Sequence, residues 1–166
     1  MSRRRRIPPE TQHLVRQRAN ERCEYCHTSE RWQYVRFTVD HIVPLAQGGS
    51  DTPDNLALAC FHYNRRKSDR LTALDPDSGE EVLLFNPRQD DWGEHFMWSG
   101  DGLFVIGLTP VGRATIEALA LNRDRVINIR AADRMVGTHP LATQCREQVE
   151  RGRRGCNCDS ENAGCA

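Results

Sequence analysis

The residues most able to do chemistry lie between positions 37 and 70. A carboxylate and an imidazole stand side by side at Asp40 and His41, and Asn64 follows on the next predicted helix. Asp40 and Asn64 offer oxygen ligands of the kind that a hard divalent cation such as Mg²⁺ binds. His41 can take a proton from water at neutral pH. Together they predict hydrolysis of a phosphodiester, in which the cation neutralises phosphate charge and His41 generates hydroxide.

Other residues of this stretch are expected to support those three. Asn55 can fix the intervening loop through side-chain hydrogen bonds to backbone and so hold His41 in place. Arg65, Arg66 and Lys67 are expected in the first turns of the following helix, where cations and backbone amides favour phosphate. A solvated helix face is the alternative interpretation of these three cations.

The elements that position these residues can be read from the pattern. Residues 34–39 alternate apolar and polar, which predicts a half-buried strand ending at Asp40 and His41. Neighbouring side chains on a strand diverge, so the strand must twist or bulge there if both serve one site. A loop follows, and a helix is expected over residues 60–70. A preceding helix over 10–22 leads into the tight knuckle Cys23-Glu-Tyr-Cys26-His27.

This constellation resembles the HNH endonucleases, of the ββα-metal or His-Me finger class. The resemblance is carried by Val-Asp-His-Ile-Val-Pro at 39–44, Gly-Gly at 48–49, Asn-Leu at 55–56 and Asn64-x-x-Lys67. It implies that His41 is the general base, that Asp40 and Asn64 bind the catalytic divalent ion, and that Asn55 supports the loop. Residues 64–69 are also similar to the HNH segment of CRISPR effector nucleases.

The first Cys-x-x-Cys pair, Cys23 and Cys26, fits the family pattern, but the second pair departs from it. Many members bind a structural zinc with two Cys-x-x-Cys pairs, and here the second pair is Cys60-Phe-His62-Tyr63. A neutral phenol is a poor zinc ligand, so Cys23, Cys26 and Cys60 supply three thiolates at best. His62 or His27 could add a nitrogen, or the zinc site is incomplete. Buried or free thiols are the alternative.

The resemblance extends over roughly residues 12–136 and implies an α+β fold. A small ββα-metal core, with a preceding helix and a zinc-knuckle-like element, is followed by a β-hairpin and helices. The expected division is a basic flexible N-terminus (1–9), the HNH core (10–70), an extension packed on it (71–136) and a disordered tail (137–166). The segments at 84–88 and 107–115 resemble an extension found in a subset of bacterial HNH proteins.

Local signals predict the elements of that extension. Asp75 to Gly79 reads as a turn before a short strand at 82–85. Residues 94–98 and 103–107 flank Ser99-Gly-Asp-Gly102 and predict a hairpin. Thr109 followed by Pro110 predicts the capped start of a helix that runs to Leu121, and a further helix is expected from about 124 to 135.

Composition limits the class of protein. Net charge is zero over 166 residues, yet residues 1–70 carry thirteen Lys and Arg against eight Asp and Glu, and residues 71–130 carry five against ten. An anionic partner would therefore meet the first half. The absence of long apolar runs and of an export signal predicts a soluble cytoplasmic protein without membrane contact. Seven cysteines, an odd number, favour metal binding or free thiols over disulfides.

The sequence thus predicts a metal-dependent HNH endonuclease acting on DNA, with Mg²⁺ or a similar divalent cation at the catalytic site and structural zinc in the knuckle. RNA cleavage fits the same residues, and the oligomeric state is left open. A catalytically decayed nucleic-acid-binding module on the same scaffold is the alternative. A zinc-stapled protein-interaction module is a third possibility, which the basic first half disfavours.

Overall fold

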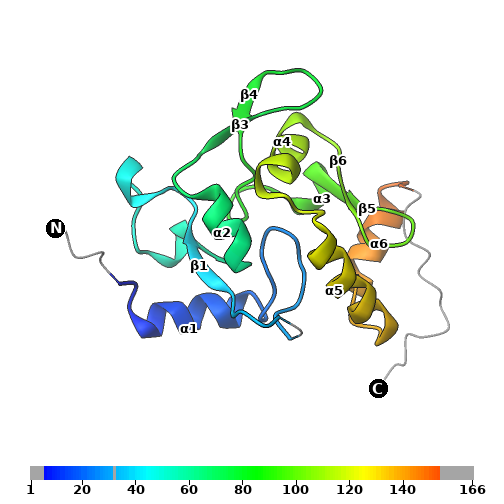
Figure 1. Cartoon of the computed structure of the whole chain (residues 1–166), viewed down its shortest axis with the longest axis horizontal. Coiled ribbons are helices and arrows are strands. Elements are labelled where there is room, and N and C mark those ends of the chain that lie inside the picture. The colour runs from blue at the N-terminus through cyan, green and yellow to red at the C-terminus, as the bar shows by residue number, and fades with distance from the viewer. Residues whose placement is uncertain (1–5, 32, 154–166) are drawn as a thin grey trace.

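The computed structural model describes residues 6–31 and 33–153, and it has the expected α+β fold (Figure 1). The expected flexibility of residues 1–5 and disorder of residues 154–166 lie outside the described part. Within that part the strands form three separate antiparallel pairs, β1 with β2, β3 with β4 and β5 with β6. The helices are α1 (Pro9–Arg18), α2 (Phe61–Lys67), α3 (Trp92–His95), α4 (Pro110–Leu119), α5 (Asp124–Met135) and α6 (Ala142–Glu150). The strands are β1 (Thr38–His41), β2 (Leu56–Ala59), β3 (Thr72–Leu74), β4 (Glu81–Leu83), β5 (Phe96–Trp98) and β6 (Val105–Gly107).

A ββα unit made of β1, β2 and α2 carries the predicted chemistry. Asp40 pairs with Ala57 and His41 with Leu56 across the two strands. The strand predicted over 34–39 begins only at Thr38, and Val35, an apolar residue of that stretch, is exposed. The local pattern did not predict β2. All four of its residues are buried, so it is a continuous apolar run without the alternation that marks a half-buried strand.

The helix before the knuckle is shorter than predicted. It ends at Arg18, and Asn20 and Glu21 then take left-handed backbone conformations, with φ of 49° and 53°. Residues in this conformation cannot continue a right-handed helix, so they turn the chain into the knuckle. The knuckle closes with the His27 amide donating to the Cys23 carbonyl at 2.8 Å.

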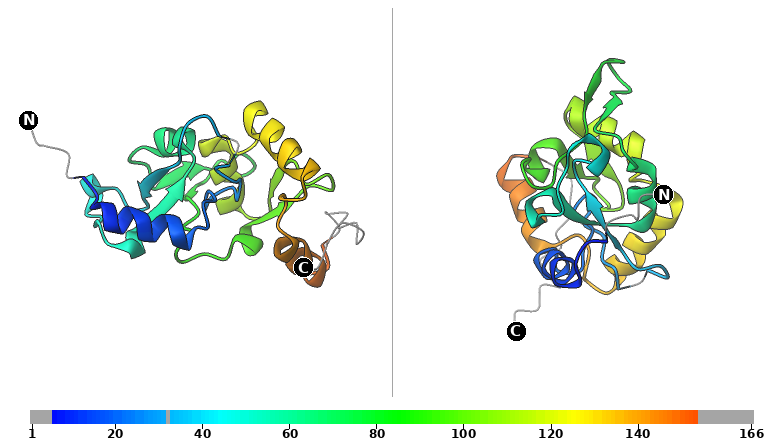
Figure 2. Two further views of the ribbon diagram at one scale, coloured as in Figure 1. Left: turned by 90° about the horizontal axis from the view of Figure 1, so that it is seen from below. Right: turned by 90° about the vertical axis from the view of Figure 1, so that its left-hand side faces the viewer.

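Most elements of the extension lie where the sequence places them. Thr109 caps α4 by accepting a hydrogen bond from the Gly112 amide at 3.1 Å, although the helix ends at Leu119 rather than Leu121. The predicted hairpin is present as β5 and β6, and α5 runs from Asp124 to Met135 as predicted. The β3–β4 hairpin projects from the body of the molecule (Figure 2). A bidentate ion pair between Arg113 on α4 and the buried Asp75 holds it, at 2.8 and 2.7 Å.

The expectation that disorder begins at residue 137 is wrong for residues 142–150, which form α6. The Gln148 amide exchanges two hydrogen bonds with the backbone of Trp98, each 3.1 Å long. The indole Nε1–H of Trp98 donates to Gln144 at 3.2 Å. These side chains on α6 bind a strand about fifty residues away, a partnership that local composition does not reveal.

A fully buried arginine joins α5 to the rest of the molecule. The guanidinium of Arg130 donates to the carbonyls of Leu103 and Leu121 at 2.8 and 2.9 Å, and lies 5.2 Å from the centre of the Trp98 ring. A buried cation of this kind is tolerated only when its hydrogen bonds are made.

We predict that Arg130→Met lowers the free energy of unfolding by about 3 kcal/mol, because two or more buried acceptors lose their donor. Urea denaturation followed by circular dichroism measures the change. Arg125→Met, at an exposed position of the same helix, serves as control and is expected to stay within about 0.5 kcal/mol of the parent. Equal effects of the two substitutions would contradict the conclusion that the buried Arg130 joins α5 to the rest of the molecule.

Candidate active site and cysteine cluster

Asp40, His41 and Asn64 line one surface pocket of about 380 Å³. The strand β1 contributes the first two residues and the helix α2 contributes the third. Val39, Pro44, Leu45 and Ser68 complete the lining. The structure therefore brings the three residues singled out in the sequence to one place.

The carboxylate of Asp40 is buried, with 2% of the residue exposed, and has two strong partners. The hydroxyl of Tyr25 donates to Oδ2 at 2.7 Å, and the ammonium of Lys67 lies 3.2 Å from the same oxygen. Burial raises the pKa of the Asp40 carboxyl, while Lys67 and the Tyr25 hydrogen bond oppose that rise. Asp40 thus has a buried counter-ion in Lys67 and a hydrogen-bond donor in Tyr25.

The structure corrects the expected position of Lys67, which is the only lysine of the chain. The residue is 2% exposed, and its Nζ also donates to the His41 carbonyl at 2.8 Å. Its ammonium therefore lies inside the protein as the counter-ion of Asp40 and is not displayed to a phosphate. An arginine, with its larger planar guanidinium, is not an equivalent replacement for such a point charge.

The other two cations of α2 are on the surface but in its last turn, not in the first turns as the sequence predicts. The short helix ends at Lys67, so its free amides lie away from these side chains. Arg65 is exposed and lies over the Phe61 ring at 5.7 Å. The Arg66 Nε donates to the Ala118 carbonyl of α4 at 3.0 Å.

Sequence reasoning missed the partner of His41. Its Nε2 lies 2.8 Å from Oδ1 of Asp51, which belongs to the loop between β1 and β2. Because an ionised carboxylate can only accept, this contact favours the tautomer of a neutral imidazole with its proton on Nε2 and its lone pair on Nδ1. The sequence signal is weak, because an aspartate after Gly48-Gly49-Ser50 reads as an ordinary turn residue.

The two asparagines have different surroundings. Asn55 clamps the loop by accepting from the Val43 amide and donating to the Val43 and Ser50 carbonyls, each at 2.9 Å. Asn64 donates from Nδ2 to the Thr38 hydroxyl at 2.8 Å. Its carbonyl oxygen makes no hydrogen bond within the described residues. That oxygen is therefore available as a ligand.

A second pocket of about 290 Å³ adjoins the first, because both include Val39 and His41. Arg6 and Arg16 are among its lining residues. The imidazole thus lies between two hollows, one with the candidate cation ligands and one with cationic side chains.

The thiols of Cys23, Cys26 and Cys60 form a buried cluster with all sulfurs within 4.8 Å of one another. The Sγ atoms of Cys26 and Cys60 are 3.8 Å apart. Two sulfurs bound tetrahedrally to zinc at about 2.3 Å are separated by about 3.8 Å, so the donor set fits this metal. Burial raises the pKa of the Cys23 and Cys60 thiols, so zinc binding must displace their protons.

Among residues 6–31 and 33–153, no His, Cys, Asp or Glu joins the three thiols as a fourth ligand. Tyr63, at the expected position, donates its hydroxyl to the Leu121 carbonyl at 3.3 Å, and burial together with the nearby thiols raises its pKa far above the usual range. His62, proposed from the sequence, is not part of the cluster. His27 is instead hydrogen-bonded to Gln144 of α6 and stacked on Trp92 with ring centres 4.7 Å apart.

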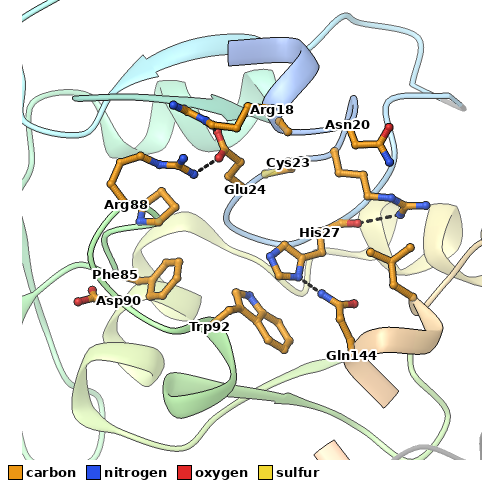
Figure 3. Close-up of a pocket in the computed structure, with 14 residues that line it drawn as sticks. Arg18, Asn20, Cys23, Glu24, His27, Phe85, Arg88, Asp90, Trp92 and Gln144 are labelled. Carbon is orange, nitrogen blue, oxygen red and sulfur yellow. Dashed lines mark hydrogen bonds and ion pairs between the residues drawn. The ribbon is translucent and has the colours of Figure 1, made fainter. Parts of the chain in front are cut away.

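The outer side of the knuckle faces a third pocket of about 270 Å³ (Figure 3). Glu24 reaches across it to Arg88, and its other carboxylate oxygen accepts from the Leu58 amide of β2 at 2.7 Å. The stacked rings of His27 and Trp92 form the opposite wall. These contacts join the knuckle to the ββα unit on one side and to the extension on the other.

Comparison with known proteins agrees with this geometry. Residues 23–70 match the family model described as HNH endonuclease. The Septu protein PtuB of Bacillus mycoides (strain KBAB4) is 28% identical over 144 residues, which cover 71% of this chain and 48% of that protein. The chain therefore spans about half the length of this curated relative. No solved structure matches the chain significantly.

Residues 23–70 thus match the HNH endonuclease family, and the resemblance predicted from the sequence is confirmed over these residues. The domain contains the knuckle, both strands of the ββα unit and α2. Among the described residues, no helix has the length and apolar character needed to span a membrane.

We predict that the purified protein contains about one zinc ion per chain, bound by three thiolates, and that Cys60→Ser removes most of it. Elemental analysis of the dialysed protein measures the content. His62→Ala is the matched variant and is expected to keep its zinc, since this imidazole is outside the cluster. Loss of zinc from His62→Ala with retention in Cys60→Ser would refute this ligand set.

Proposed function

We propose that the protein is a metal-dependent endonuclease that hydrolyses phosphodiester bonds in DNA. The observation that carries the proposal is the common pocket of Asp40, His41 and Asn64 within the HNH domain. A carboxylate and an amide carbonyl are hard oxygen donors, and an imidazole beside them can act on a water molecule. This combination suits phosphodiester hydrolysis better than chemistry on an uncharged substrate.

His41 is proposed as the general base. With Asp51 accepting a hydrogen bond from Nε2–H, the Nδ1 lone pair is free to take a proton from the attacking water. Asn55 keeps the loop after His41 closed, and Lys67 fixes the His41 carbonyl, so the backbone that follows the imidazole is held at two points. Such preorganisation keeps a base within reach of its water.

Asp40 and Asn64 are the proposed ligands of Mg²⁺ or a similar divalent ion. A carboxylate has about four lone-pair positions, so the contacts to Tyr25 and Lys67 leave room on Asp40 for a cation. The free carbonyl oxygen of Asn64 supplies the second donor. A cation bound there would neutralise the scissile phosphate and the leaving 3′ oxygen.

The DNA backbone is proposed to cross this face of the domain. Arg6 lines the pocket beside His41, and Arg65 and Arg66 follow the proposed ligand Asn64 on α2. Arg16 in the same pocket is paired with Glu30 at 2.8 Å. Neutralisation of phosphates by such side chains makes binding sensitive to salt. Lys67 is not included, because it is buried against Asp40.

The alternative function is a nucleic-acid-binding module whose catalysis has decayed. The specific observation in its favour is the engagement of Asp40 by Lys67, because a carboxylate tied to a buried ammonium can serve structure alone. The two functions separate in one assay. Supercoiled DNA that is bound but not nicked, with or without Mg²⁺ or Mn²⁺, identifies the module, whereas nicking that EDTA abolishes identifies the nuclease.

We predict that His41→Ala lowers metal-dependent nicking of supercoiled plasmid by at least about 100-fold, because the general base is lost. The nicking rate is measured on gels at saturating Mg²⁺, and circular dichroism verifies the fold. His62→Ala, which removes an imidazole on the nearby α2, is the control and is expected to cleave normally. Undiminished nicking by His41→Ala would remove this residue as the base.

Asp51→Ala is expected to slow nicking by about 10- to 100-fold, since the His41 ring loses the partner that fixes its tautomer and orientation. Single-turnover rates with the same plasmid measure the effect. Asp54→Ala removes an exposed carboxylate of the same loop and is expected to leave the rate unchanged. If both variants behave alike, the contact between Asp51 and His41 has no catalytic consequence.

A further inference from the structure

One hydrogen bond links the cysteine knuckle directly to the candidate active site. Tyr25 lies between Cys23 and Cys26 in the chain and is 1% exposed. Its hydroxyl donates to Oδ2 of Asp40 across 2.7 Å, a short distance typical of a strong bond to a carboxylate. The knuckle thus contacts the proposed cation ligand through a single side chain.

Tyr25 is held on both sides of its own backbone. The preceding residue, Glu24, is bonded to β2 twice, since its amide donates to the Leu58 carbonyl at 2.8 Å and its carboxylate accepts from the Leu58 amide at 2.7 Å. The indole of Trp92 donates to the Tyr25 carbonyl at 3.0 Å. Figure 3 shows the side chains of Glu24 and Trp92. The backbone that carries the Tyr25 phenol is therefore held in place beside Asp40.

The two partners of Asp40 act differently. Lys67 neutralises its charge, but the ammonium contacts both oxygens, at 3.3 and 3.2 Å, and also the His41 carbonyl. A point charge placed in this way does not define how the carboxylate plane is rotated. The Tyr25 hydroxyl bonds one oxygen at one distance, and this directional contact fixes the rotation.

We propose that Tyr25 is a positioning residue of the nuclease, whose hydroxyl orients Asp40 for the divalent cation. The inference rests on the proposed function, because it takes Asp40 as a cation ligand. It makes the affinity of the catalytic site for its cation depend on the cysteine knuckle. Groups that orient a ligand in this way typically contribute 10- to 100-fold to metal affinity or activity.

The chain offers a matched pair of variants. Tyr25 and Tyr63 are both buried tyrosines, 1% and 0% exposed, and the pKa of each phenol is raised by burial and by the neighbouring cysteines or Asp40. Only Tyr25 reaches Asp40, whereas Tyr63 donates to the Leu121 carbonyl. Replacing each by phenylalanine removes one buried hydroxyl and leaves the ring.

The test measures Mn²⁺ binding to the zinc-containing full chain by calorimetry, together with the dependence of plasmid nicking on Mn²⁺ concentration. Tyr25→Phe is expected to weaken Mn²⁺ binding about tenfold and to recover most of its nicking rate at saturating Mn²⁺. Tyr63→Phe is expected to bind Mn²⁺ like the parent. Equal Mn²⁺ affinities of Tyr25→Phe and the parent overturn the proposal.

Two further variants keep the result interpretable. Asp40→Asn must weaken Mn²⁺ binding, and if it does not, Asp40 is no ligand and the inference falls. If the parent protein binds Mn²⁺ through Asp40 but does not nick DNA, the proposed nuclease function is wrong. The comparison of Mn²⁺ affinities between Tyr25→Phe and the parent still decides the role of Tyr25. If Tyr25→Phe fails to fold, Trp92→Phe removes the bond that anchors the Tyr25 carbonyl, and an unchanged Mn²⁺ affinity in that variant also counts against the proposal.

Discussion

The buried carboxylate of Asp40 is the constraint on which the rest of the domain depends. A charge with 2% of its residue exposed is stable only if its surroundings compensate it, and here the compensation comes from two other elements. Lys67 brings the end of α2 against β1, and Tyr25 brings the knuckle to the same point. The position of His41, next in the chain, follows from this arrangement. The proposed cation ligand and this constraint on folding are thus the same residue.

The extension takes over part of the structural role that a fourth zinc ligand would have. The Leu121 carbonyl accepts both from Tyr63, which stands at the missing ligand position, and from the buried Arg130 of α5. Arg130 also approaches the knuckle, with Nε 3.4 Å from the Thr28 hydroxyl. Gln144 on α6 reaches His27 on the outer side. Hydrogen bonds from three later segments therefore brace the cysteine cluster, which has three thiols.

The sequence was most informative where the signal is local. The order of Asp40, His41 and Asn64 was enough to predict residues that line one pocket, and Thr109-Pro110 marked the start of α4. It failed where long-range contacts decide. The burial of Lys67 depends on Asp40, twenty-seven positions earlier, and α6 is ordered by contacts with Trp98. Asp51 and Tyr25 look like turn and spacer residues until the fold places them beside His41 and Asp40.

The central claim is that Asp40 and Asn64 share one divalent cation beside His41. The most direct measurement is a crystal structure of the protein soaked in Mn²⁺, with the ion located by anomalous diffraction. The account predicts an anomalous peak in the pocket between β1 and α2, at coordination distance from Oδ of Asp40 and from the carbonyl oxygen of Asn64. A pocket without Mn²⁺, in crystals where Asp40 remains bonded only to Tyr25 and Lys67, would contradict it.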